Sequence, residues 1–184
     1  MSQRKVILFI AASLDGYIAT QDEDLSFLSI VQKEGEDYGY EKFIRNVDTV
    51  IMGRKTYDWI MKEVNDYPHP DKDSYIITRT PRQDIGRIRF YTGNMRDLIR
   101  HLKLDDNGKN IFVDGGAEVI DVLLKENLID EFIISIIPIL LGDGIRLFKD
   151  NRPELQLSLM HSECYGTGLV QLHYQAINIR SEGI

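Results

Sequence analysis

The residues best suited to chemistry are cations and hydroxyls that directly follow a glycine at the end of an apolar run. Gly53-Arg54-Lys55-Thr56 comes after the apolar run 50–52 and before a segment with helical spacing. Glycine lets the backbone turn tightly, and the free N–H groups at a helix start attract anions. Arginine adds a planar donor fork that suits phosphate. The segment predicts a phosphate-binding turn; the alternative is an ordinary strand-to-helix connection with exposed cations.

A second turn of this kind is Asp114-Gly115-Gly116-Ala117-Glu118, and a third strand end carries Thr78-Arg79. Neighbouring parallel strands end at one edge of a sheet, where open α/β sheets bind ligands. Neither the three-glycine dinucleotide fingerprint nor a P-loop is present. The pattern therefore favours an extended, phosphate-rich cofactor held by several separate turns. For Gly115-Gly116 the alternative is a tight turn that needs glycine for its own backbone geometry. For Arg79 the alternative is an arginine in a solvated loop.

Hydrophobic periodicity predicts strands that alternate with helices, followed by strands alone. Strands are expected over Val6–Ala12, Asp48–Met52, Ser74–Thr78, Ile88–Tyr91, Ile111–Val113, Asp130–Ile137, Leu155–Ser162 and Leu169–Ile177. Helices are expected over Tyr38–Arg45, Thr56–Lys62, Met95–Leu104 and Ala117–Glu126. This order predicts an α/β fold with a mostly parallel central sheet and an antiparallel C-terminal hairpin, in a single domain over residues 1–184.

Composition excludes several classes of function. A hydrophobic content of 43% is enough for a core, and a net charge of −7 makes binding to nucleic acid or to a membrane surface unexpected. The single cysteine, Cys164, forbids an intrachain disulfide and fits a cytoplasmic location. The four histidines are scattered without metal-ligand spacing, so no metal site is expected.

Four segments, taken in order, make the chain resemble the dihydrofolate reductase superfamily. They are Ala12-Ser13-Leu14-Asp15-Gly16-Tyr17-Ile18-Ala19, Val50-Ile51-Met52-Gly53-Arg54-Lys55-Thr56-Tyr57, Val113-Asp114-Gly115-Gly116-Ala117 and Pro138-Ile139-Leu140-Leu141-Gly142-Asp143-Gly144. Within the superfamily the chain is most similar to the reductase domain of the bifunctional riboflavin-biosynthesis deaminase–reductase and its stand-alone relatives. The resemblance implies a three-layer α/β/α architecture.

The resemblance also implies NADPH as the cofactor. The 53–56 segment would hold the adenosine side, residues 115–118 would wrap the pyrophosphate, and residues beside the first strand would line the nicotinamide pocket. Arg54 would face the 2′-phosphate or the pyrophosphate. The implied cofactor contacts are Ala12, Leu14, Ile18, Gly53, Arg54, Lys55, Thr56, Thr78, Arg79, Gly115, Gly116, Ala117 and Glu118.

The substrate side has several candidates. Dihydrofolate reductases place a carboxylate on the first helix, and Asp37 lies roughly in that region, with Tyr38 and Glu41 as competitors. Asp37 and Asp15 are the candidate catalytic acids, and Tyr38, Glu41 and Asp114 are candidate substrate contacts. The alternatives are that Asp37 starts a helix and that Asp15 caps its own loop. Riboflavin-type reductases often carry glutamate where Asp114 stands.

The leading interpretation is an NADPH-dependent reductase of a pterin- or pyrimidine-like small molecule, similar to 5-amino-6-(5-phosphoribosylamino)uracil reductase. Dihydrofolate reduction is the alternative, but residues 25–28 replace the family's tryptophan-proline-leucine-proline signature. A non-catalytic nucleotide-binding protein is the third hypothesis. The zinc motif of the deaminase half is absent from the sequence. The apolar run 133–141 and the alternating tail predict a homodimer through the C-terminal strands.

Overall fold

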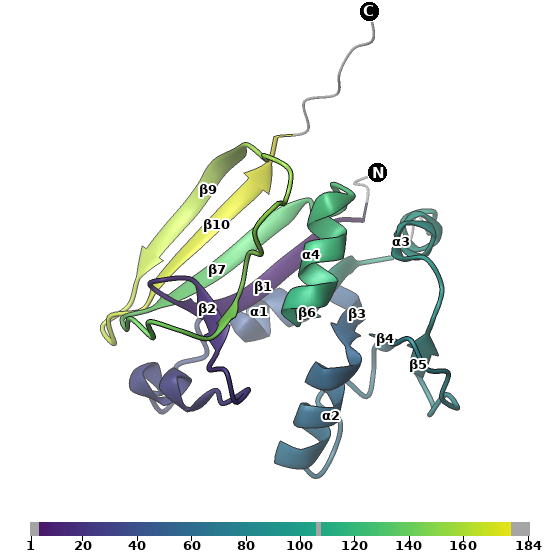
Figure 1. Ribbon diagram of the computed structural model, residues 1–184, viewed down its shortest axis with the longest axis horizontal. Helices are drawn as coiled ribbons and strands as arrows, with labels where there is room; N and C mark the ends of the chain where they lie inside the picture. The colour runs from purple at the N-terminus through teal and green to yellow at the C-terminus, as the bar shows by residue number, and fades with distance from the viewer. Residues whose placement is uncertain (1–3, 106–107, 178–184) are drawn as a thin grey trace, which may run out of the picture.

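The computed structural model describes residues 4–105 and 108–177 and contains an eight-stranded sheet (Figure 1). Across the sheet the strand order is β5-β4-β3-β6-β1-β7-β10-β9. The strands are β1 (Val6–Ser13), β3 (Val47–Gly53), β4 (Asp73–Ile77), β5 (Ile88–Tyr91), β6 (Asn110–Gly115), β7 (Glu131–Ile137), β9 (Leu157–Cys164) and β10 (Val170–Ala176).

The sheet is parallel from β5 to β7, whereas β10 runs antiparallel to both β7 and β9. The predicted α/β class, with its mostly parallel sheet and antiparallel C-terminal hairpin, is therefore confirmed. Parallel neighbours need a crossover, and helices make most of these connections. The four α-helices are α1 (Tyr40–Ile44), α2 (Arg54–Glu63), α3 (Met95–Lys103) and α4 (Ala117–Lys125).

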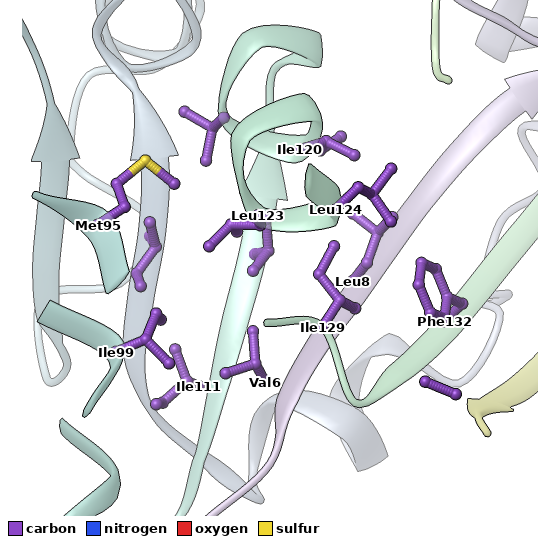
Figure 2. Close-up of a cluster of buried hydrophobic side chains, with 14 of the residues drawn as sticks. Val6, Leu8, Met95, Ile99, Ile111, Ile120, Leu123, Leu124, Ile129 and Phe132 are labelled. Atoms are coloured by element: carbon purple, nitrogen blue, oxygen red, sulfur yellow. The ribbon is translucent and has the colours of Figure 1, made fainter. Parts of the chain in front are cut away.

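Side-chain alternation along the central strands divides the core between the two faces of the sheet. On one face, Val6 and Leu8 of β1 and Ile111 of β6 pack against α3 and α4 (Figure 2). On the other face, Phe112 of β6 packs with aromatic side chains of α1 and α2, among them Phe43. The helices thus cover both faces, which gives the expected three layers.

Three short elements were not expected from the sequence. Strands β2 (Tyr17–Ala19) and β8 (Ile145–Arg146) pair with each other in a small second sheet, and η1 (Ser26–Val31) is a 3₁₀-helix. Periodicity cannot find them, because the strands are too short and their partners lie far apart in the sequence. The 3₁₀-helix is held by tertiary packing, since Phe27 and Val31 are buried beside Ile137 at the end of β7.

Candidate active site

The parallel register brings the predicted phosphate turns to one edge of the sheet. Gly53 at the end of β3 is level with Ile77 of β4, directly before Thr78, and Met52 is level with Gly115 of β6. A Cβ atom added to Gly53 would lie 3.7 Å from the backbone N of Gly116 and 3.9 Å from the carbonyl oxygen of Gly115. The two glycine turns are therefore direct neighbours.

The double glycine forms the floor of this edge. Gly115 has a φ of 118° and is joined to Gly116 by a cis peptide bond. A side chain at Gly115 would be strained by that φ, so glycine is required there. A Cβ atom on Gly116 would lie only 3.2 Å from the Thr56 hydroxyl. The two glycine backbones thus approach each other between the starts of α2 and α4, beside the side chains of Thr56 and Val119.

Both helices at this edge begin without a side-chain cap. Gly53 precedes α2 and Gly116 precedes α4, and neither supplies a side-chain acceptor to the first turn. Helix α3 differs, because the Asn94 side chain accepts hydrogen bonds from the backbone N–H groups of Arg96 and Asp97. The uncapped N–H groups of α2 and α4, with the positive ends of their dipoles, suit a bound anion.

The predicted polar cofactor contacts have protein partners of their own. Arg54 donates a 2.5 Å hydrogen bond to Asp58 one turn later, and Lys55 pairs with Glu23 from the loop after β2. Glu118 is exposed and pairs with Lys149. Two further candidates lie in the turn after β4.

In that turn, the buried Thr78 bonds through its hydroxyl to the backbone N–H and carbonyl of Thr80, while Arg79 is exposed. Beside β1, Ala12 is buried in the core, Ile18 packs against it, and Leu14 is exposed. Leu14 is thus the candidate of these three that offers a free side chain to a ligand.

The Asp114 carboxyl directly precedes the double glycine and faces an aromatic wall formed by Tyr40, Phe43, Tyr67 and Phe112. The β6 register shifts at Asp114, but its charge acts on Tyr40 and Tyr67, which pack in the same cluster as Phe112, so it faces the side of the sheet covered by α1. Burial raises its pKa to about 6, and its charge in turn contributes to the raised pKa values of Tyr40 and Tyr67. None of the described residues forms a hydrogen bond with this carboxyl. It is therefore a half-buried acid with free hydrogen-bonding capacity.

The two candidate catalytic acids have structural partners instead. Asp15 accepts hydrogen bonds from the Ser13 hydroxyl and from the backbone N–H groups of Leu141 and Gly142, which hold its pKa below the usual range. Asp37 accepts from the backbone N–H groups of Glu41 and Gly39 at the start of α1, which also lowers its pKa. These contacts favour the loop-capping and helix-start interpretations.

Tyr38 and Glu41 do not join Asp114 through any contact of the described residues. The Tyr38 hydroxyl is hydrogen bonded to the Val31 carbonyl and, at 3.0 Å, to the Thr167 hydroxyl. Glu41 is exposed and pairs with Arg45 at 3.4 Å on the same side of α1. Nor do three or more His, Cys, Asp or Glu side chains gather into a metal-binding cluster within the described ranges.

Comparison with known proteins adds the family. The family model described as the RibD C-terminal domain matches residues 4–171. The chain belongs to this family. The uncharacterized protein YwjB of Bacillus subtilis (strain 168) is 41% identical over 174 residues, which cover 94% of this chain and 98% of YwjB.

Solved structures agree with the RibD-family assignment. A protein from Shewanella sp. PV-4, provisionally assigned to riboflavin biosynthesis, has a TM-score of 0.84 at 31% identity, covering 94% of this chain and 99% of its own. The Thermotoga maritima diaminohydroxyphosphoribosylaminopyrimidine deaminase/5-amino-6-(5-phosphoribosylamino)uracil reductase has a TM-score of 0.70 at 13% identity. It covers 95% of this chain and 57% of the Thermotoga chain, and at that identity the likeness concerns the fold.

A pocket of about 410 Å³ opens beside the aromatic wall of this RibD-family domain. Tyr40 and His69 line it together with the cations Arg45, Lys72 and Lys109. His69 is 5% exposed, its ring forms no hydrogen bond with the described residues, and the ring packs edge-on against Phe112 and Tyr67. Burial, with a contribution from the charge of Lys72, lowers the His69 pKa to about 4. Its imidazole is therefore neutral at physiological pH.

Sequence reasoning missed His69, Lys72 and Tyr67, because they belong to a polar, proline-containing segment that predicts a solvated loop. No local signal distinguishes a loop that folds back over the sheet from one that extends into solvent. The helical spacing of residues 38–45 predicts Tyr40 in a helix but indicates no role for it in the site. One signal for the wall beside Asp114 was present in the sequence. Phe112 and Asp114 are two residues apart, so regular strand alternation predicts both on one face of the sheet.

None of the described helices is both long and apolar enough to cross a membrane.

Proposed function

We propose that this RibD-family chain is an NADPH-dependent reductase of a pyrimidine- or pterin-like small molecule, similar to 5-amino-6-(5-phosphoribosylamino)uracil reductase. The observation that carries the proposal is the position of Asp114. Its carboxyl, free of protein hydrogen bonds and with a pKa raised to about 6, comes directly before the double-glycine turn and faces the aromatic wall. A cofactor turn and a substrate acid are thus adjacent residues.

The edge of the sheet fits a dinucleotide. A pyrophosphate needs backbone N–H groups that no side chain covers. Side chains at Gly53 and Gly116 would occupy the space beside the backbone N–H groups of these turns. The helices α2 and α4 begin there without side-chain caps. The residues that would hold NADPH at this edge are Gly53, Arg54, Lys55, Thr56, Thr78, Arg79, Gly115, Gly116, Ala117 and Glu118. Leu14 would contact the nicotinamide from beside β1, with Ala12 and Ile18 behind it.

NADPH, when bound, supplies the hydride that reduces a carbon of the acceptor. Asp114 would hold a ring N–H of the acceptor or give a proton to the atom next to the reduced carbon. A carboxyl with a pKa near 6 keeps a protonated fraction at neutral pH, which a general acid needs. The lowered pKa values of Asp15 and Asp37 make them poorer proton donors.

The pocket beside the aromatic wall supports an acceptor that carries a polar or anionic substituent. Lys72 is buried and has Asp71 as its ion-pair partner at 3.0 Å, and Lys109 donates to the Arg45 carbonyl at 2.8 Å. Lys109 directly precedes β6 and Asp114 lies near the other end of that strand, so these charges lie at a distance from Asp114. A substituent that extends from a ring at Asp114 past Tyr40 and His69 would reach them. The phosphoribosyl group in the name of the Thermotoga reductase is of this kind.

Two features favour this proposal over the alternatives. Folate reduction expects a free acid near the first helix, but the backbone N–H groups of α1 occupy the Asp37 carboxylate. A protein that only binds nucleotide has no need of an acid without hydrogen bonds beside its cofactor turn, whereas Asp114 is such an acid, with a pKa raised to about 6 by burial.

The test is a substrate screen that follows loss of nicotinamide absorbance from NADPH. The acceptors are 5-amino-6-(5-phosphoribosylamino)uracil, its dephosphorylated form, related pyrimidines and dihydrofolate. We expect oxidation with a pyrimidine acceptor and its loss in Asp114→Asn, which removes the acid at nearly constant volume. Oxidation with dihydrofolate alone would support the folate alternative. Tight NADPH binding without oxidation by any acceptor would support the binding protein.

A further inference from the structure

Two arginines from different elements meet on one carboxylate beside the start of α2. Arg54 donates from Nη1 to Asp58 Oδ2 at 2.5 Å. Arg82, in the loop between β4 and β5, donates from Nη1 to Asp58 Oδ1 at 2.9 Å and from Nη2 to Oδ2 at 3.4 Å. Hydrogen bonds from the two arginines outweigh the partial burial of Asp58 and lower its pKa. The cluster therefore carries two positive charges and one negative charge at neutral pH.

The cluster has donors to spare. Each guanidinium has more N–H groups than its contacts with Asp58 use, and the others have no partner within the described part of the chain. Both arginine side chains are 40% exposed, so a solute can reach them. The Arg82 guanidinium also lies over the Phe90 ring, 5.5 Å from its centre, which restricts its plane. Asp58 and Phe90 thus hold Arg82 near Arg54 and leave some of its N–H groups unused.

We propose that Arg82 is a second specificity-determining residue for the cofactor, which binds the 2′-phosphate of NADPH together with Arg54, and that Asp58 positions the two guanidiniums. The inference rests on the proposed function, since it assigns residues to the cofactor named there. Arg54 is the residue directly after Gly53, so the cluster adjoins the turn that would hold the adenosine side.

The chemistry of the cluster favours a phosphate over a hydroxyl. A phosphomonoester carries a charge between −1 and −2 and several acceptor oxygens, which can take donors from two guanidiniums at once. The 2′-hydroxyl of NADH has one oxygen and no charge, so it cannot compensate the remaining positive charge. The Asp58 oxygens already accept from the arginines, so their charge is partly compensated before a phosphate arrives.

The experiment measures equilibrium binding of NADPH, NADH, 2′,5′-ADP and 5′-AMP to the full chain by titration calorimetry, independent of turnover. The variant is Arg82→Gln. The matched control is Arg89→Gln, because Arg89 also lies over an aromatic ring, 5.9 Å from the centre of Tyr75, and pairs with an aspartate, Asp73. We expect Arg82→Gln to weaken NADPH and 2′,5′-ADP about 10-fold or more, with NADH, 5′-AMP and the control unchanged.

The outcomes separate the two proposals. A wild-type protein that prefers NADPH, with the preference undiminished in Arg82→Gln, would overturn the role of Arg82 and leave the proposed function standing. A wild-type protein that binds neither dinucleotide would overturn both. Asp58→Asn tests the positioning role: we expect it to lower the NADPH-to-NADH affinity ratio. Tighter NADPH binding in that variant would mean that Asp58 repels the phosphate, and would overturn the role given to it.

Discussion

The carboxylate of Asp15 accepts a 2.7 Å hydrogen bond from the backbone N–H of Gly142, and this bond joins the end of β1 to the loop after β7. The Leu141 N–H adds a second bond at 3.1 Å, and the Ser13 hydroxyl donates a third at 2.6 Å. These donors favour the ionised form, with Ser13 making the largest contribution to the lowered pKa. Asp15 therefore functions as an acceptor that anchors a loop at the candidate active site.

We predict that Asp15→Ala lowers the melting temperature and leaves the pH dependence of turnover unchanged. The substitution leaves two loop N–H groups without their acceptor. Because the pKa is lowered in the folded state, the stabilisation from Asp15 is present at neutral pH and is lost as pH falls below the usual carboxyl range near 3.8. Thermal unfolding at several pH values checks this. A displaced acidic limb of the rate profile would instead indicate proton transfer by Asp15.

We predict that Asp114 makes the stability of the protein depend on pH in the direction opposite to Asp15. Its folded pKa is raised from 3.8 to about 6, so the folded state binds the proton more tightly than the unfolded chain. Stability is then greatest below the unfolded value and falls as pH rises through about 6. Asp114→Asn removes this loss, and we expect it to raise the free energy of unfolding by about 1–3 kcal/mol at alkaline pH.

Urea denaturation of both proteins on either side of pH 6 provides the measurement. The variant should gain little stability on the acid side, where the wild-type carboxyl is already neutral. It should also lose reductase turnover, so that stability and activity change in opposite directions. A variant that is less stable than the wild-type protein at alkaline pH would show that the ionised carboxylate has a stabilising partner.

The turns of this site could be predicted from the sequence, whereas the choice among the acids could not. Gly53 and Gly115 follow apolar runs whose period and order are local properties, and parallel strands then bring such ends to one edge. The environments of Asp15, Asp37 and Asp114 depend on groups distant in sequence or on backbone donors that no pattern displays. His69 was missed for the same reason, because its burial comes from Phe112 on a different element.

We predict that a single methyl group added at Gly53, between the two glycine turns, weakens the binding of NADPH. Gly53 has a φ of −74° and a ψ of 154°, which alanine adopts freely, so Gly53→Ala should change the melting temperature little. Its Cβ atom would lie 3.4 Å from Val119 Cγ2 and 3.7 Å from the Gly116 nitrogen, over the proposed pyrophosphate donors. We expect NADPH affinity to fall about 10-fold or more, as measured by titration calorimetry.

Gly166→Ala is the control for that substitution, because a Cβ atom there would meet nothing within 4 Å. It should leave NADPH affinity unchanged and so report any general effect of alanine. Wild-type affinity in Gly53→Ala would mean that the cofactor does not approach the backbone between the two turns.

The exposed edge strand β9 predicts self-association. All eight of its residues are exposed, and Leu159 and Met160 have 53% and 55% of their surface accessible. An unpaired edge with apolar side chains is a template for pairing, and a second copy of the chain offers the same edge. We propose a homodimer through the C-terminal strands, and we expect sedimentation to find a dimer at micromolar concentration. Leu159→Lys should dissociate it, because the dimer would bury the new charges at the interface. Leu104→Lys is the control, since Leu104 is 77% exposed and directly follows α3, away from the C-terminal strands. A monomeric wild-type protein at that concentration would refute the dimer, and a dimer that survives Leu159→Lys would place its interface elsewhere on the molecule.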